Sequence, residues 1–275
     1  MSKRIEFTQE QLDKMKELYE SGLGSRRIAK VFDVSRQTID RRLRKMDTKI
    51  RPIGVGGGIP PASVNEHFFD DLGHERPAYY LGLLFADGCV YDRPHGRQKV
   101  LSLSQSMNGA ELVEQFVHDI EYGGNINHYI HKDGRTGVIV QITSDYLCDR
   151  LIALGCTQKK TLVIRFPSQV PWETMRHFLR GYTDGDGCLG IYDGQSKIRI
   201  SSGSRPFLVE FRGALCAMLP TINDNNKISK VRRKNCYTLQ WSSNFQCAQI
   251  ASLLYGDCSV ALLKKYDMAQ QMMAI

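Results

Sequence analysis

Two aspartates in equivalent places of a repeated segment are the residues of this 275-residue sequence best suited to chemistry. Asp87 lies in YLGLLFADGC at residues 80–89, and Asp186 lies in LRGYTDGDGC at residues 179–188. The glycine after each aspartate is typical of a helix end, so both carboxylates would lie beside the negative pole of a helix dipole. A carboxylate is disfavoured there by ~0.3–1 kcal/mol, and two such groups repel each other further. Mg²⁺ would relieve both penalties, because it prefers hard oxygen ligands. The alternative is that each aspartate only accepts backbone N–H bonds beyond its helix.

The elements that position these aspartates come from an internal duplication. The aspartates are 99 residues apart, and VQITS at residues 140–144 matches LQWSS at residues 239–243 with the same offset. In each half, the motif helix is followed by segments of period two (100–104, 137–142, 197–201, 237–241) and by helical segments (110–120, 146–154, 207–219, 246–254). Each half therefore predicts the order α-β-β-α-β-β-α, which is an α+β unit with an antiparallel sheet.

Small residues would let the two motif helices approach each other closely. Gly82 and Ala86 lie one helical turn apart in the first motif, as Gly181 and Gly185 do in the second. Without larger side chains at these places the two backbones can lie side by side, which predicts that the two aspartates are neighbours.

The paired motifs resemble the signature helices of the LAGLIDADG homing endonucleases in their single-chain form. The first motif matches the signature at Gly82, Leu83, Ala86, Asp87 and Gly88, and the second at Leu179, Gly181, Asp184, Asp186 and Gly187. The resemblance extends from Glu75 to the C-terminus. It implies two pseudo-symmetric halves, residues 75–172 and 173–275, whose antiparallel sheets form a saddle for double-stranded DNA. It also implies a monomeric enzyme of intron homing, which makes a metal-dependent double-strand break with 3′ overhangs in a long DNA target.

The resemblance also implies a catalytic set. Two or three divalent cations, Mg²⁺ with Mn²⁺ or Ca²⁺ able to replace it in binding, would lie at Asp87, Asp186, Ala86 and Gly185. In the family, a lysine late in each half polarises the water network, and we place Lys160 and Lys264 in this role. Each belongs to a Lys-Lys pair, 159–160 or 264–265, and the sequence leaves open which member acts. Gln141 and Gln240 would either contact the active-site water or stabilise the sheet.

Basic residues near the predicted strands are candidates for DNA contacts, because alternating basic and polar residues on a sheet can follow a major groove. These are Arg93, Arg97, Lys99 and Arg135 in the first half and Lys197, Arg199, Lys230, Arg232, Arg233 and Lys234 in the second.

The N-terminal residues form a separate basic region. Residues 1–51 hold 14 Lys/Arg against 8 Asp/Glu, whereas the remaining 224 hold 23 against 21. Three helices are expected in residues 1–50, with caps at Thr8, Ser25 and Ser35, and this pattern resembles a helix-turn-helix DNA-binding domain. A purely structural three-helix bundle is the alternative. The third helix would contact DNA through Arg36, Gln37, Thr38, Arg41 and Arg42. Residues 51–74, with GVGGG at 54–58, predict a flexible linker.

Composition excludes several other classes of protein. No apolar run reaches the ~18 residues of a membrane span, and the first residues lack the apolar core of a signal peptide. The eight cysteines form no C-x-x-C pair, which argues against a zinc site or a disulfide framework. We therefore expect the cytoplasm of a bacterial or phage-infected cell, or another reducing compartment that contains DNA.

Two other functions fit parts of the sequence. A non-catalytic DNA-binding regulator could use the same fold, although a decayed site has no physical reason to keep both aspartates. An intron maturase that binds RNA is a second alternative, against which the DNA-type N-terminal region argues. The first residue, Met1, and the last four residues, MMAI, do not match the ends of an intein.

Overall fold

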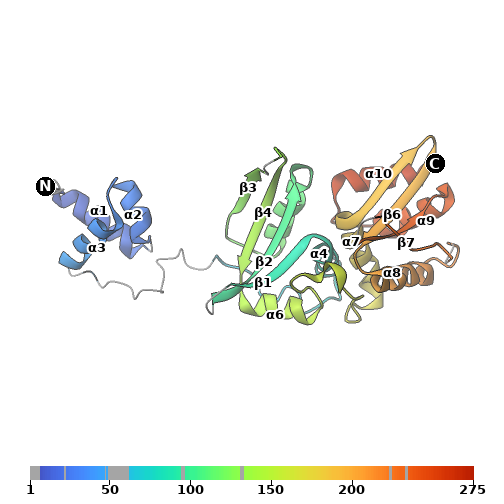
Figure 1. Cartoon of the computed structure of the whole chain (residues 1–275), viewed down its shortest axis with the longest axis horizontal. Helices are drawn as coiled ribbons and strands as arrows, with labels where there is room; N and C mark the ends of the chain where they lie inside the picture. The colour runs from blue at the N-terminus through green and yellow to red at the C-terminus, as the bar shows by residue number, and fades with distance from the viewer. Residues whose placement is uncertain are drawn as a thin grey trace. The chain divides into compact units, whose positions relative to one another are not determined.

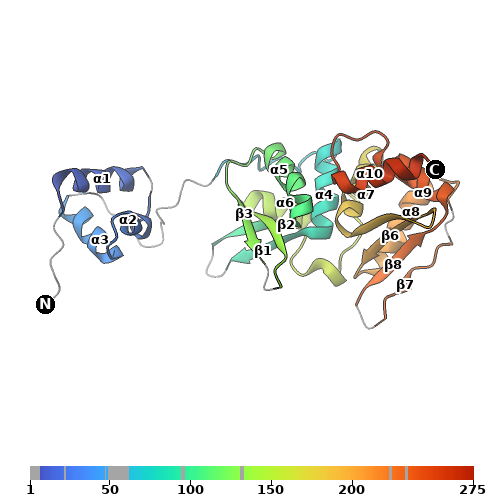
Figure 2. The same cartoon turned by 90° about the horizontal axis from the view of Figure 1, so that it is seen from above.

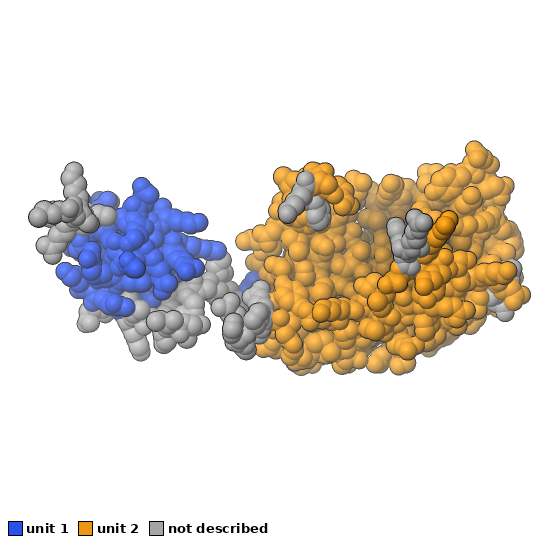
Figure 3. Space-filling model, in the orientation of Figure 1, with its two compact units in different colours: residues 1–62 blue, residues 63–275 orange. Residues whose placement is uncertain are grey.

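The computed structural model describes residues 7–21, 23–46, 48, 62–93, 97–130, 133–222, 225–232 and 235–275, and at 93 and 97 only the backbone. The chain divides into two compact units, residues Met1–Ala62 and Ser63–Ile275 (Figure 3). Each unit has its own hydrophobic core. Among the described residues, no helix is both long enough and apolar enough to span a membrane.

The first unit contains three short helices, α1 (Gln9–Glu20), α2 (Ser25–Val31) and α3 (Arg36–Lys45). Thr8 caps α1 in a capping box with Gln11, and Ser35 caps α3, as the sequence predicts. The predicted cap at Ser25 is wrong by one residue, because Gly24 is the N-cap and makes no side-chain hydrogen bond. The hydrophobic core of this unit consists of Met15, Tyr19, Ile28, Ala29, Ile39 and Leu43.

The second unit is an α+β fold in which one order of elements occurs twice, as the sequence predicts. The first half comprises α4 (Glu75–Asp87), β1 (Gly88–Arg93), β2 (Arg97–Ser106), α5 (Ala110–Asp119), β3 (Ile126–Ile130), β4 (Thr136–Thr143) and α6 (Asp145–Ala153). The second comprises α7 (Met175–Asp186), β5 (Gly187–Tyr192), β6 (Gln195–Ser202), α8 (Arg205–Met218), β7 (Ser229–Lys230), β8 (Tyr237–Trp241) and α9 (Asn244–Tyr255). A short 3₁₀ helix, η2 (Lys160–Leu162), follows α6 in the first half, and a further helix, α10 (Leu263–Met273), follows α9 in the second.

The two sheets have the same topology. Their strand orders are β1-β2-β4-β3 and β5-β6-β8-β7, and every neighbouring pair is antiparallel (Figure 1). Ser102 pairs with Gln141 in the first sheet, and Arg199 pairs with Gln240 in the second. Burial alternates along β4 and β6, so each sheet has a buried inner face and a more exposed outer face.

Helices α4 and α7 lie side by side between the two sheets (Figure 2). A Cβ atom added to Gly82 would lie 2.1 Å from the Phe178 carbonyl oxygen, and one added to Gly181 would lie 1.9 Å from the Tyr79 carbonyl oxygen. Only glycine allows two helix backbones to come this close, so the paired glycines permit the close contact between the two halves.

Candidate active site

The two aspartates lie where the paired helices end. Asp87 is the last residue of α4, and Asp186 is the last residue of α7. A Cβ atom added to Gly185 would lie 2.9 Å from Oδ2 of Asp87 and 2.2 Å from the Cβ of Ala86. The Asp87 carboxylate therefore reaches across the interface to α7, and four of the predicted residues come together at one place.

Asp87 is partly buried, and its carboxylate accepts a hydrogen bond from a neighbouring side chain. The Nε2 of Gln105, on β2, donates a hydrogen bond of 2.7 Å to Oδ2 of Asp87. Burial raises the pKa of Asp87 above its usual value, against the hydrogen bond from Gln105 and the charges of Lys265 and Lys160. Because burial disfavours the ionised form of Asp87, a positive charge nearby would stabilise this carboxylate.

The negative charge of Asp87 affects the pKa of Asp186. Removal from water, and then the negative charge of Asp87, raise the pKa of Asp186 to about 6. The hydroxyl of Tyr182 and the charges of Lys160 and Lys265 oppose this shift. Two carboxylates that repel each other at one helix junction form an arrangement that a cation would stabilise.

Two lysines reach the backbone at the ends of these helices. Lys160, buried on η2, donates from Nζ to the carbonyl oxygen of Gly88. Lys265, the third residue of α10, donates from Nζ to the carbonyl oxygens of Thr183 (2.7 Å) and Asp184 (2.6 Å). Burial lowers the pKa of Lys265, whereas the charges of Asp184 and Asp87 raise it. Each half therefore supplies one ammonium group beside the carboxylates.

The predicted Lys264 does not reach this place. Its side chain is exposed on α10, whereas Lys265 shares a helix face with the buried Ala269 and Met272. The spacing of residues 265, 269 and 272 is the sequence signal that distinguishes the two lysines.

The two predicted glutamines also lie away from the aspartates. Both are exposed, and their Nε2 atoms donate to other partners: Gln141 to the hydroxyl of Tyr91 at 2.9 Å, and Gln240 to Ser242 at 2.8 Å. Sequence reasoning missed Gln105, which has the parity of the buried Leu101 and Leu103 on β2 and so belongs to the inner face.

The predicted DNA-contact residues of the sheets divide into two groups. Lys197 and Arg199 lie on the outer face of the second sheet, with Nζ of Lys197 5.4 Å from the centre of the Tyr192 ring. Lys99 has the parity of the inner face and pairs with Asp149 on α6 at 2.8 Å, so it does not fit the predicted role.

The other residues of this set are located as follows. Arg135 pairs with Asp133 at 2.8 Å between β3 and β4. Lys230 is exposed, but it pairs in register with Tyr237, which has the parity of the inner face of β8. The position of Lys230 therefore belongs to the inner face and not to the predicted DNA-contact face. Arg232 is exposed. The side chains of Arg93 and Arg97, and all of Arg233 and Lys234, lie outside the described residues.

On α3, the side chains of Arg36, Gln37 and Arg41 are exposed, although Arg36 pairs with Asp40 at 3.3 Å. The hydroxyl of Thr38 lies 2.9 Å from that of Ser35 at the helix cap. The guanidinium of Arg42 lies 5.2 Å from the centre of the Phe7 ring, so its place in the bundle favours packing over a DNA contact.

Family models match both units of the chain. Residues 6–45 match the helix-turn-helix domain of resolvase, and residues 173–260 match the LAGLIDADG-like domain. The resemblance that the repeated motif indicates is therefore confirmed for the second half, and the helix-turn-helix pattern is confirmed for the N-terminal region.

Individual proteins show more distant likenesses. A probable translation initiation factor IF-2 of Methanocaldococcus jannaschii is 26% identical over 161 residues, which are 56% of this chain but only 12% of that protein. The homing endonuclease I-LtrWI bound to target DNA has a TM-score of 0.47 at 11% identity, over 76% of this chain and 91% of that one. Meganuclease I-SmaMI bound to DNA gives 0.48 at 14%, over 72% and 89%. The N-terminal LAGLIDADG domain of WhiA gives 0.43 at 13%, over 74% and 88%.

Proposed function

We propose that this chain, which carries a LAGLIDADG-like domain, is a site-specific homing endonuclease that makes a metal-dependent double-strand break in DNA. One observation carries the proposal: Asp87 and Asp186 lie at the junction of α4 and α7, with an ammonium group from each half beside them. Acidic and cationic groups at one junction can hold an anionic phosphate and the cations that neutralise it.

The donor set fits a hard divalent cation such as Mg²⁺. Asp87 and Asp186 offer carboxylate oxygens, and Ala86 and Gly185 flank them. Among the described residues, no group of three or more His, Cys, Asp or Glu side chains could hold a metal by itself. The remaining ligands would be water and DNA phosphate oxygens, which is how Mg²⁺ is commonly bound at phosphate-cleaving sites. When bound, the cation would supply an activated water and would neutralise charge on the phosphate.

The residues of the chain have separable tasks in this reaction. Gln105 holds the Asp87 carboxylate through a hydrogen bond, whereas the Tyr182 hydroxyl, which donates to the carbonyl oxygen of Ser201 at 3.0 Å, lowers the pKa of Asp186. Lys160 and Lys265 bring positive charge to the helix ends, where the dipole would otherwise repel a phosphate. Because one chain supplies both halves, we propose that a monomer cuts both strands.

The compact site also determines which phosphates it can reach. Two neighbouring carboxylates can serve two phosphates only if these face each other across the minor groove, which is ~6 Å wide. Such phosphates are offset toward the 3′ side of each strand, so we expect 3′ overhangs. Lys197 and Arg199 on the second sheet would contact DNA beside the cut, and Arg36, Gln37 and Arg41 on α3 would make separate DNA contacts.

The test begins by selecting a target from a random duplex library by binding in Ca²⁺. The selected duplex is then incubated with Mg²⁺, and the product ends are sequenced. We expect both strands to be cut with 3′ overhangs. Blunt ends or 5′ overhangs would contradict the paired-helix site, and tight binding without cleavage would favour the DNA-binding regulator.

A further inference from the structure

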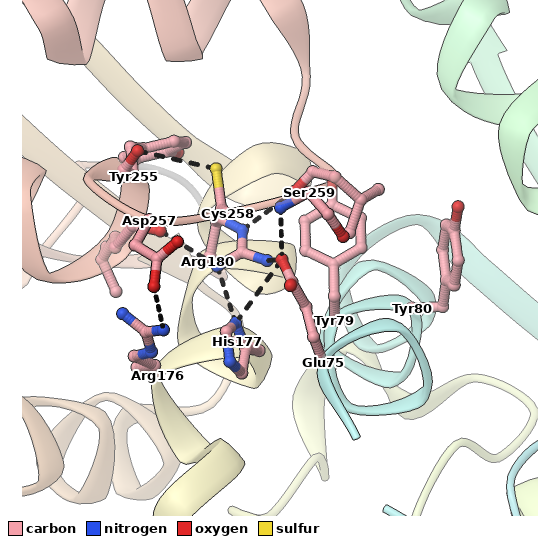
Figure 4. Close-up of polar contacts among 12 residues, drawn as sticks. Glu75, Tyr79, Tyr80, Arg176, His177, Arg180, Tyr255, Asp257, Cys258 and Ser259 are labelled. Carbon is pink, nitrogen blue, oxygen red and sulfur yellow. Dashed lines mark hydrogen bonds and ion pairs between the residues drawn. The ribbon is translucent and has the colours of Figure 1, made fainter.

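A buried cation lies on α7, outside the proposed chemistry. Arg180 is 0% exposed, and its guanidinium makes several directed contacts (Figure 4). Nε donates to the carbonyl oxygen of Val260 at 3.0 Å, Nη1 to that of Leu254 at 3.1 Å, and Nη2 to Oε1 of Glu75 at 2.6 Å. One side chain thus joins the end of α9 and the loop after it to the first residue of α4.

Glu75 and His177 complete this buried network. Glu75 also accepts a hydrogen bond of 2.8 Å from the backbone N–H of Ser259. Burial alone would raise the pKa of Glu75, but the hydrogen bond from Ser259 and the charge of Arg180 lower it, so the carboxylate is ionised. Burial, and then the charge of Arg180, lowers the pKa of His177 to about 4, so its neutral Nδ1 accepts from Nη1 of Arg180 at 2.8 Å.

The same segment, residues 254–262, is held again near the end of α7. Asp184 accepts a hydrogen bond of 2.8 Å from the backbone N–H of Leu262 and one of 2.7 Å from the hydroxyl of Tyr255. Residues 177, 180 and 184 are three and four positions apart, so they occupy one face of α7. That face fixes the segment along its whole length.

Helix α10 begins directly after this segment, at Leu263. We propose that Arg180 and Glu75 are positioning residues for Lys265, because they hold the segment that carries α10 to the carboxylates. This inference rests on the proposed function. At the equivalent positions of the first half, 99 residues earlier, stand Leu81 and Ala78 in place of Arg180 and His177. The network therefore serves Lys265 and not Lys160, which lies on η2.

The first test needs neither DNA nor metal. The double variant Glu75→Gln/Arg180→Met removes both charges together, which avoids leaving one buried and unpaired. We expect amide hydrogen exchange in residues 256–265 to become about tenfold faster or more. The matched control is Arg76→Met/Asp119→Asn, because this ion pair joins α4 to α5 and does not touch the segment. Unchanged exchange in the double variant would overturn the proposal.

A variant that keeps the charge balance covers the case in which the double variant does not fold. Arg180→Lys retains the positive charge beside Glu75 but lacks the planar fork that reaches two carbonyl groups at once. We expect exchange in residues 256–265 to be faster than in the wild type by about threefold or more. Wild-type exchange in this folded variant would likewise overturn the proposal.

The second test separates positioning from a general effect on the fold. The cleavage rate of each strand is measured for the double variant, for Lys265→Ala and for Lys160→Ala. We expect the double variant to slow the same strand as Lys265→Ala, by about tenfold more than the other strand. An equal loss on both strands, or the pattern of Lys160→Ala, would reject the positioning role. If the wild type cuts no DNA, the proposed function fails, whereas the exchange result still judges the network.

Discussion

The two halves of the second unit share their topology but differ in how they support the site. In the first half, Gln105 holds Asp87 and a short 3₁₀ helix carries Lys160. In the second, the hydroxyl of Tyr182 lowers the pKa of Asp186, and a buried polar network fixes the helix that carries Lys265. The duplication has kept the backbone contact and the carboxylates, while the residues around them have diverged.

The outer faces of the two sheets also differ. Lys197 and Arg199 lie on the outer face of the second sheet, whereas Ser102, the counterpart of Arg199 by strand register, and Ser104 have the outer-face parity on β2 of the first. Among the strand side chains that the structure describes, the outer face of the first sheet holds no lysine or arginine. Under the proposed function, the second half would contribute more phosphate contacts and the first half more neutral hydrogen bonds.

The largest effect should come from the shared helix contact. We expect Gly82→Ala and Gly181→Ala each to lower the free energy of unfolding by more than about 3 kcal/mol, the upper end of overpacking costs, since the new Cβ would meet backbone atoms that cannot move away. Urea unfolding measures this loss. The control is Gly213→Ala on α8, which has no atom within 4 Å of the added Cβ and should gain up to about 1 kcal/mol. If one of the two variants lost much less free energy of unfolding than the other, the two glycines would not contribute equally to the helix contact.

A second effect concerns the pH dependence of stability that His177 causes in the second half. His177 is neutral when folded, because its pKa is lowered to about 4, and protonation therefore favours the unfolded chain. Its contribution to stability is complete above pH ~6.5, the usual histidine value, and is lost as the pH falls toward 4. We expect urea unfolding to show the wild type losing stability relative to His177→Gln over this range. A constant difference between the two proteins would mean that His177 titrates normally in the fold.

Element order and the position of the two aspartates at the ends of paired helices were predictable, because a repeat offset and helix-end glycines are local signals. The residues that surround the two aspartates were not predictable, since their role depends on which face of a helix or strand they occupy after folding. Lys99 resembled a DNA contact by charge alone, but its parity with Leu101 and Leu103 brings it to Asp149. Lys264 and Lys265 are neighbours in sequence, and only the buried face of α10 separates them.

A smaller effect concerns the partner of one carboxylate. Gln105→Leu removes the hydrogen bond that lowers the pKa of Asp87, so we expect about tenfold weaker apparent Mg²⁺ affinity in cleavage titrations. Gln141→Leu should leave the Mg²⁺ dependence unchanged, because the Gln141 amide donates to Tyr91. If both variants shift the titration equally, Gln105 has no special relation to the site.

The smallest effect tests the unequal sheet faces. Lys197→Ala and Arg199→Ala should each reduce the slope of log affinity against log salt by about 0.9 for every DNA phosphate that the variant no longer neutralises. Ser102→Ala and Ser104→Ala should leave that slope unchanged, although they can alter sequence preference. Fluorescence anisotropy measures these slopes. Equal slopes for all four variants would mean that the unequal charge of the two sheet faces has no effect on DNA binding.

The proposed site needs both carboxylates. Single-turnover cleavage by Asp87→Asn and by Asp186→Asn measures this need, with Asp193→Asn in the β5–β6 turn as the control. We expect each site variant to bind the target in Ca²⁺ as the wild type does, and to lose more than about 10²-fold in the rate of double-strand cleavage. The control should cut normally. If either site variant still linearises the target at the wild-type rate, the paired-carboxylate site is wrong.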